Sequence, residues 1–160
     1  MNKIKPEQLE EMIGKDLGFS NWYQIDQGLI NNFAKCTGDE QFIHIDEKRS
    51  RLESPFGGTI AHGFLSLSLL TKFANESNFE IENTKIVINY GFDKIRFIQP
   101  VRSEKKIRAK FSLLNVSKRK QNEILVKYGV TVELENENEN ENEQKQKPVL
   151  FAEWLTLLIL

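Results

Sequence analysis

The sequence predicts an α+β domain in which an antiparallel sheet wraps around a long, buried central helix. Residues 64–73 place apolar side chains on nearly every face of a helix, which is typical of a helix enclosed by other elements. The second half of the chain then contains stretches in which apolar and polar residues alternate with the period of half-buried strands. These stretches follow one another directly, whereas parallel strands need crossovers of about a dozen residues. We therefore expect antiparallel strands.

The first half of the chain is expected to contain short elements joined by loops. The expected order is a surface helix, an extended segment, an amphipathic helix and another short helix, at residues 5–12, 17–25, 27–37 and 47–52. Gly38 is a residue type that commonly ends a helix. The mixed stretch 39–46 is expected to form a loop or a single turn, and Asp46 can cap the helix that follows it.

The second half supplies the expected sheet. Alternating strands are predicted around residues 86–90, 107–113 and 124–132, with a last apolar strand at 151–160. Residues 135–147 read ENENENENEQKQK and contain no apolar side chain, so we expect a disordered loop inserted between two strands. Residues 1–160 are expected to form one domain.

Composition excludes several classes of function. The net charge of −1 gives no global reason to expect a nucleic-acid partner, and no apolar run is long enough to predict a membrane span. The N-terminus does not resemble a secretory signal. Cys36 is the only cysteine, lies in an apolar-periodic stretch and is expected to be a buried, inert thiol. We expect a cytoplasmic protein.

Two histidines and one aspartate stand out as candidates for chemistry. Asp39 precedes His44 by five residues in a predicted loop, so a carboxylate and an imidazole can converge on one water molecule. With ordinary pKa values near 3.9 and 6.5, such a pair can take and deliver protons at neutral pH. The alternative is that Asp39 only caps the following turn and that each histidine is a structural hydrogen-bonding residue.

His62 and Gly63 stand where the buried helix is expected to begin. The first N–H groups of a helix lack intrahelical partners, and glycine has no Cβ to hinder a substrate carbonyl. The Gly63 N–H is therefore a candidate oxyanion donor. The alternative is that Gly63 serves only close packing of the helix on the sheet.

These motifs together resemble the MaoC-like hydratase family. Residues 38–46 (GDEQFIHID) and 57–68 (GGTIAHGFLSLS) are similar to its pattern of Asp, four residues, His and a later Ala-His-Gly at the start of the central helix. Residues 89–97 (NYGFDKIRF), Pro100-Val101 and the ending around residues 152–155 (AEWL) resemble the branch of nodulation-protein-N-like proteins. The resemblance covers nearly the whole chain apart from the Glu/Asn tract.

The resemblance implies a hot-dog fold, a homodimer formed edge to edge, and an acyl-CoA bound at the dimer interface. It implies addition of water to a trans-2-enoyl-CoA to give the (3R)-hydroxyacyl-CoA, or the reverse dehydration. Asp39 and His44 would activate the water, the Gly63 N–H would polarise the thioester carbonyl, and Ser68 would support the site. Ala61, His62 and Phe42 would contact the substrate.

Further features bear on the substrate. Many members of the family have Asn-Pro where this chain has Gln41-Phe42. This difference affects the expected substrate more than the expected fold. Lys94 and Arg96 follow the Asn-Tyr-Gly segment and are candidates for CoA phosphate contacts, although alternating basic residues are typical of a solvated strand face.

Alternatives to a hydratase are a hot-dog acyl-CoA thioesterase and an acyl-CoA binding module without catalysis. The same buried helix and oxyanion donor would serve a thioesterase. The presence of Gln41 and Phe42 in place of Asn-Pro is compatible with a binding module that lacks catalysis. No metal site is expected, because the chain offers few histidine and cysteine ligands. No nucleotide cofactor is expected, because no glycine-rich phosphate loop follows a strand.

Overall fold

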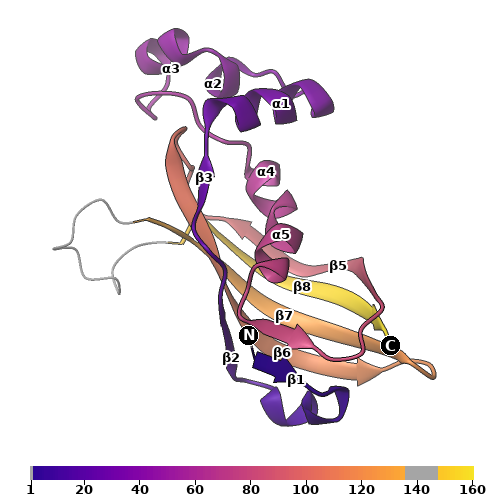
Figure 1. Ribbon diagram of the computed structural model, residues 1–160. Coiled ribbons are helices and arrows are strands. Elements are labelled where there is room, and N and C mark those ends of the chain that lie inside the picture. Colours follow the sequence, from indigo (N-terminus) through magenta and orange to yellow (C-terminus); the bar gives the residue numbers. More distant parts are fainter. Residues whose placement is uncertain (1, 136–147) are drawn as a thin grey trace, which may run out of the picture.

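The computed structural model describes residues 2–135 and 148–160 (Figure 1). Its core is a curved antiparallel sheet whose principal strand order is β2-β6-β7-β8-β5, with β3 also paired to β6. These strands are β2 (Asp16–Phe19), β3 (Tyr23–Ile25), β5 (Ile86–Phe97), β6 (Lys105–Lys118), β7 (Glu123–Leu134) and β8 (Leu150–Ile159). A small parallel pair, β1 (Asn2–Ile4) with β4 (Phe79–Ile81), lies beside it. The α+β class and the antiparallel sheet predicted from the sequence are confirmed.

The alternation in the strand sequences sets the two faces of the sheet. On β6, the side chains of Ile107, Ala109, Phe111 and Leu113 are fully buried, while the residues between them are partly exposed. Strand β8 alternates in the same way along its whole length. β5 differs, because it pairs only with β8 and most of its residues are exposed. It forms one edge of the described sheet, opposite the edge formed by β2 and β3. Its pairing with β8 is irregular between Asn89 and Gly91 and between Phe92 and Lys94.

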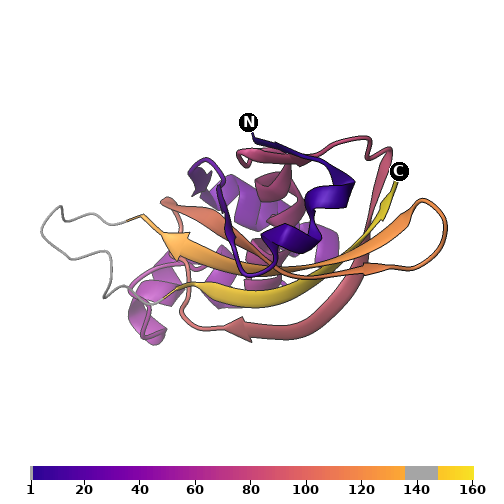
Figure 2. The ribbon, with the colours of Figure 1, turned by 90° about the horizontal axis from the view of Figure 1, so that it is seen from below.

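The central helix lies against the concave side of the sheet (Figure 2) but is not one helix enclosed on all sides. It consists of α4 (Gly63–Ser68) and α5 (Leu70–Asn75), which are labelled in Figure 1 and meet at Leu69. Leu65, Leu70 and Phe73 are buried, whereas Phe64 is 66% exposed. The expectation of a single helix buried all round is therefore wrong, because the sheet covers only one side of it.

The first half of the chain contains short helices at the end of the sheet where α4 begins (Figure 1). They are α1 (Gln27–Thr37), α2 (Phe42–Ile45) and α3 (Glu47–Glu53). As the sequence predicts, Asp46 caps α3, since its carboxylate accepts a hydrogen bond from the Arg49 N–H at 2.9 Å. Residues 39–46 contain the single helical turn α2.

Three expectations need correction or remain open. The N-terminal surface helix is two 3₁₀ turns, η1 (Pro6–Gln8) and η2 (Glu10–Met12), which seat Leu9 in the core. Cys36 is exposed, because it lies on the outer face of α1 opposite Ile30 and Ala34. The loop predicted at residues 135–147 lies, from residue 136 onward, outside the described residues. Among the described residues, none of the helices is long and apolar enough to cross a membrane.

Candidate active site

Asp39 and His44 are positioned by the abrupt end of α1. Gly38 has φ +78°, a left-handed conformation that glycine adopts without steric cost, and its N–H donates to the Ala34 carbonyl at 2.8 Å. The chain therefore turns at Asp39 and immediately enters the single turn α2, which points His44 into the protein. Asp39 stays exposed, so one member of the predicted pair is in contact with solvent and the other is buried.

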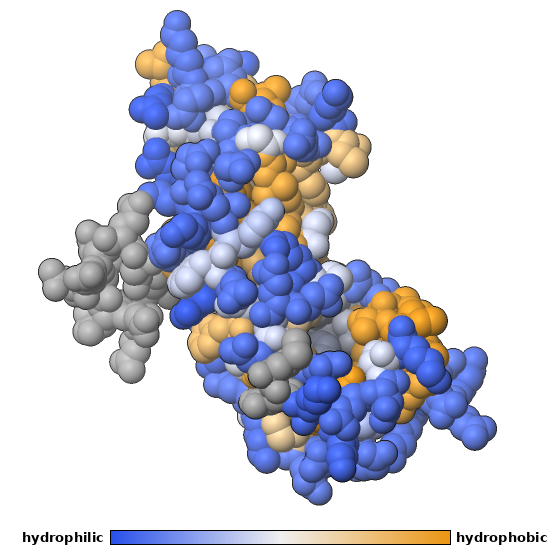
Figure 3. All heavy atoms as spheres, in the orientation of Figure 1, coloured by the Kyte–Doolittle hydropathy of each residue, from blue (hydrophilic) through white to orange (hydrophobic). Residues whose placement is uncertain are grey.

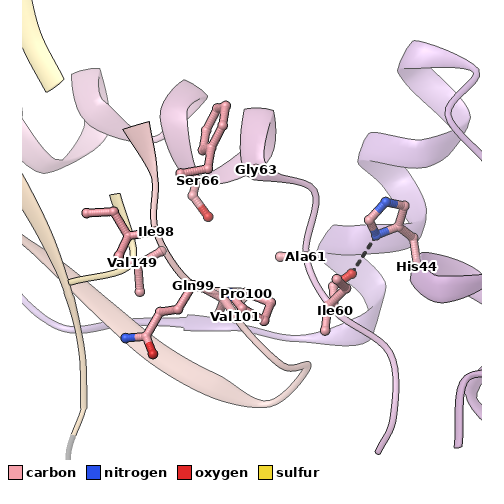
Figure 4. A pocket seen from close by; sticks show the side chains of 11 residues that line it. His44, Ile60, Ala61, Gly63, Ser66, Ile98, Gln99, Pro100, Val101 and Val149 are labelled. Carbon is pink, nitrogen blue, oxygen red and sulfur yellow. Dashed lines mark hydrogen bonds between the residues drawn. The ribbon is translucent and has the colours of Figure 1, made fainter. Parts of the chain in front are cut away.

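The tautomer of His44 is fixed by the backbone. Its Nδ1–H donates to the Ile60 carbonyl at 2.7 Å, because a carbonyl oxygen can only accept (Figure 4). Burial lowers the pKa of His44 below its ordinary value of 6.5; the Ile60 bond opposes this shift. His44 is therefore neutral at neutral pH, and Nε2 carries a lone pair that can accept a proton. The role of Ile60 in holding this ring could not be predicted from the sequence, because the contact is made by a backbone carbonyl.

His62 lies directly on His44 and holds the neighbouring loop. The two rings stack with centroids 3.7 Å apart, and Phe33 packs on His62 at 5.0 Å. His62 Nε2–H donates to the backbone carbonyl of Asp39 at 2.9 Å. Its Nδ1 is buried and has no hydrogen-bond partner among the described residues. His62 thus fixes the position of Asp39 through the backbone and leaves the Asp39 carboxylate available.

The three side chains converge on one point. Asp39, His44 and His62 each offer one oxygen or nitrogen, and these atoms all lie within 4.8 Å of one another. Such atoms are types that can bind a metal, and zinc sites with three protein ligands exist. The same atoms can equally hold one water molecule between a carboxylate and an imidazole. The backbone bond of His44 uses Nδ1, so Nε2 of this ring remains for this purpose.

A cavity of about 250 Å³ opens beside His44 and at the start of α4 (Figure 4). Gly63 and Ser66 line it from α4, and Ala61 lines it from the preceding segment. Gly63 is the first residue of α4, so its N–H is one of the donors that a helix leaves without an intrahelical partner. A Cβ at Gly63 would lie 2.9 Å from the Phe97 ring, so glycine keeps this approach open.

A network of polar side chains holds the backbone on either side of the bond between His44 and Ile60. Glu47 accepts from the Thr59 N–H at 2.8 Å and from the Thr59 hydroxyl at 2.9 Å. These bonds and the one from Arg51 lower the pKa of Glu47 to about 2. Because Thr59 precedes Ile60, Glu47 fixes the carbonyl that orients His44. Gln27 adds a second link, donating to the His44 carbonyl at 2.7 Å.

The structure brings some predicted residues to the cavity and leaves others outside it. His44, Ala61 and Gly63 line the cavity. Asp39 and His62 do not line it, although each has a polar atom within 4.8 Å of one on His44. The exposed Ser68 instead donates its hydroxyl to the Phe64 carbonyl. The serine that lines the cavity is Ser66, which lies two residues before Ser68 on α4. It was not predicted, because Ser66 differs from Ser68 only in being buried, and burial depends on how the helix packs.

Phe42, Lys94 and Arg96 also lie outside the residues that line the cavity. The Phe42 ring packs under the Arg49 guanidinium at 4.1 Å. On β5, Arg96 is paired with Phe151 of β8, and Lys94 approaches the same ring at 5.5 Å. Residues directly opposite in an antiparallel pair share a face, and Phe151 alternates with the buried Leu150 and Ala152. Lys94 and Arg96 therefore lie on the face of the sheet away from the helices.

Comparison with known proteins identifies the family of this chain. Residues 8–136 match the family model described as "MaoC like domain". Nodulation protein N of Rhizobium meliloti is 42% identical over 157 residues, which cover 98% of this chain and 92% of that protein. The 3-hydroxyacyl-thioester dehydratase Z of Mycobacterium tuberculosis is 39% identical over 121 residues, covering 76% of this chain and 79% of that protein.

Solved structures agree on the fold. The unliganded R-hydratase of Pseudomonas aeruginosa superposes with a TM-score of 0.64 at 21% identity, covering 92% of this chain and 81% of that one. The hot-dog fold expected from the sequence is confirmed, and the hydro-lyase class is confirmed at the level of the family. The chain belongs to the MaoC-like dehydratase family.

Proposed function

We propose that this protein adds water to a trans-2-enoyl-CoA to form the (3R)-hydroxyacyl-CoA, or catalyses the reverse dehydration. The observation that carries the proposal is the convergence of Asp39, His44 and His62 beside a cavity that begins at the Gly63 N–H. A neutral imidazole and a carboxylate can orient one water molecule, and the helix donor lies where a thioester carbonyl can enter. The similarity to the 3-hydroxyacyl-thioester dehydratase Z of Mycobacterium tuberculosis supports the same reaction class.

In the proposed step, the exposed Asp39 and the buried His44 act together on one water molecule. The Asp39 carboxylate and the His44 Nε2 both accept hydrogen bonds from the water, which directs an oxygen lone pair toward the β-carbon. The oxygen bonds to that carbon, and the water proton passes to the pair. The double-bond electrons move toward the thioester, where the Gly63 N–H stabilises the enolate oxygen. The pair then returns the proton to the α-carbon on the same face, so no cofactor is needed.

We also propose that a second copy of the chain pairs along β5. This edge strand exposes large apolar side chains, as does the start of α4, and Figure 3 shows apolar surface at both places. The exposed residues are Ile86, Val87, Ile88, Tyr90, Phe92, Phe97 and, on α4, Phe64. An unpaired apolar edge of this kind favours antiparallel pairing with the same edge of a second copy. Light scattering after size exclusion should give a dimer mass, and Ile88→Glu should give a monomer.

The assay that tests the reaction follows two signals from crotonyl-CoA. Loss of the conjugated-enone absorbance reports hydration, and free thiol reports thioester hydrolysis. We expect enone loss without thiol, abolished in Asp39→Asn and His44→Ala. Thiol release would instead favour a thioesterase. Tight acyl-CoA binding with neither signal, across a series of longer enoyl-CoAs, would favour a binding module.

We propose that this reaction takes place in the cytoplasm. Acyl-CoA thioesters are substrates of reducing compartments, and the exposed Cys36 has no cysteine to pair with in this chain.

A further inference from the structure

A line of exposed residues on the central helix runs away from the candidate active site. Phe64, Ser68, Thr71 and Asn75 recur at helical spacing, and all four are exposed. This face follows β5 in the opposite chain direction. The Phe64 and Phe97 rings lie 5.6 Å apart, and the Asn89 amide donates to the Thr71 hydroxyl at 3.4 Å.

A cavity lies at each end of this line of residues. The cavity beside His44 is lined by Gly63 and Phe97, at the beginning of α4 and the end of β5. A second cavity of about 420 Å³ is lined by Asn75 and Val87, at the end of α5 and the beginning of β5. Twelve residues separate Gly63 from Asn75, which at 1.5 Å per helical residue is about 18 Å. A flexible chain anchored at Gly63 can follow the helix to the second cavity.

The second cavity combines apolar walls with hydroxyl groups that lack partners. Its apolar lining includes Ala74, Phe79, Ile81, Val87, Trp154 and Leu158. Thr84 and Thr156 also line it, and the hydroxyl oxygen of each is buried and without a hydrogen-bond partner among the described residues.

Tyr128 lies in the same cavity. Its hydroxyl is a polar neighbour of Thr156, but no hydrogen bond of normal geometry satisfies the threonine. Buried hydroxyl groups in proteins are nearly always hydrogen-bonded, so two unpartnered ones in one cavity indicate a place for a polar group of a ligand.

We propose that this second cavity receives the far end of the acyl chain and selects a chain that carries a hydroxyl group there. The inference rests on the proposed function, since it extends the same substrate. The apolar walls suit the methylene chain, and the hydroxyls of Thr84 and Thr156 can each donate to and accept from a neutral hydroxyl. A carboxylate at the chain end fits less well, because Glu80 lines the same cavity.

The test compares two enoyl-CoAs of equal length. We would measure kcat/KM for crotonyl-CoA, hexadecenoyl-CoA and ω-hydroxyhexadecenoyl-CoA, since a chain of this length can span the distance to the second cavity. One or two additional hydrogen bonds predict about a tenfold preference for the ω-hydroxy substrate over hexadecenoyl-CoA. Equal rates, or a preference for the plain chain, would overturn the proposal and would mean that the two threonines are simply hydrated.

Variants locate the preference at the cavity. Thr156→Val and Thr84→Val keep the side-chain shape and remove the hydroxyl, so each should reduce the preference several-fold and leave turnover of crotonyl-CoA unchanged. Thr131→Val is the matched control, because Thr131 pairs with Phe151 on the opposite face of the sheet. A preference that survives both cavity variants, or that Thr131→Val also removes, would overturn the assignment.

A calorimetric measurement separates this inference from the proposed reaction. Failure to hydrate any enoyl-CoA, crotonyl-CoA included, would refute the proposed function. The binding of hexadecanoyl-CoA and ω-hydroxyhexadecanoyl-CoA still tests the cavity in that case. We expect tighter binding of the hydroxylated chain by about tenfold, lost in Thr156→Val. Equal dissociation constants would overturn the inference.

Discussion

The two ends of the central helix pair are built in opposite ways. At the α4 end, the polar groups of the site are fixed by the backbone: Ile60 holds His44, and the Asp39 carbonyl holds His62. At the α5 end, Thr84 and Thr156 lie among apolar side chains and have no hydrogen-bond partner in the described structure. The α4 end has the fixed geometry that proton transfer requires. The α5 end is suited to binding, because its polar groups remain available to a ligand.

The largest effect is expected from the one exposed member of the pair. Asp39→Asn keeps the side-chain shape and the backbone carbonyl that His62 binds. It removes the negative charge, so hydratase activity should fall by roughly 10²- to 10⁴-fold. The melting temperature should stay the same, because Asp39 is exposed. Unchanged activity on crotonyl-CoA would show that Asp39 serves only the turn after α1.

The next largest effect is expected at Gly63. This glycine either donates its N–H to the substrate or serves only the close packing of the helix. An added methyl group would meet the Phe97 ring at 2.9 Å, but Phe97 is half exposed and can turn away. Gly63→Ala should therefore cost little stability, yet reduce kcat/KM by about tenfold to a hundredfold by crowding the approach to its N–H. The double variant Gly63→Ala with Phe97→Ala is the control. Full recovery of activity in it would show that Gly63 matters only for packing.

The sequence predicted the general pattern of the site and missed its supports. Alternation in β6 and β7 identified the buried faces, and the spacing of Asp39, His44 and Gly63 identified residues that the fold does bring together. Backbone carbonyls carry no sequence signal, so the roles of Ile60 and of the Asp39 carbonyl were not foreseeable. Side-chain direction on a helix depends on what covers it, which is why Ser68 was chosen and Ser66 was missed.

The pH dependence of activity tests the burial of His44. Burial lowers the pKa of His44, so the neutral form that can accept a proton persists below the ordinary value of 6.5. The kcat/KM for hydration should stay constant as pH falls to 6.5 and decline only in more acidic solution. His44 should be followed directly by the NMR shifts of its ring. Since the Asp39 carboxylate opposes the shift, Asp39→Asn should move the His44 titration further toward acid. A midpoint at or above 6.5 would contradict the proposed environment of this ring.

The smallest effect is expected at Glu47, which acts on the α4 end only through Thr59 and Ile60. The pKa of Glu47 is lowered to about 2, so its carboxylate stabilises the folded protein above the ordinary value of 4.5, and this contribution is lost as pH falls from 4.5 toward 2. Because the side chain is half exposed, solvent screening reduces the effect, and Glu47→Gln should lower the free energy of unfolding at neutral pH by about 1 kcal/mol. Urea unfolding at several pH values should show the two proteins converging in acid. Activity should fall by less than in the Gly63 variant, since Gln27 still holds the His44 carbonyl. A difference in stability that persists at pH 2 would mean that Glu47 acts through packing and not through its charge.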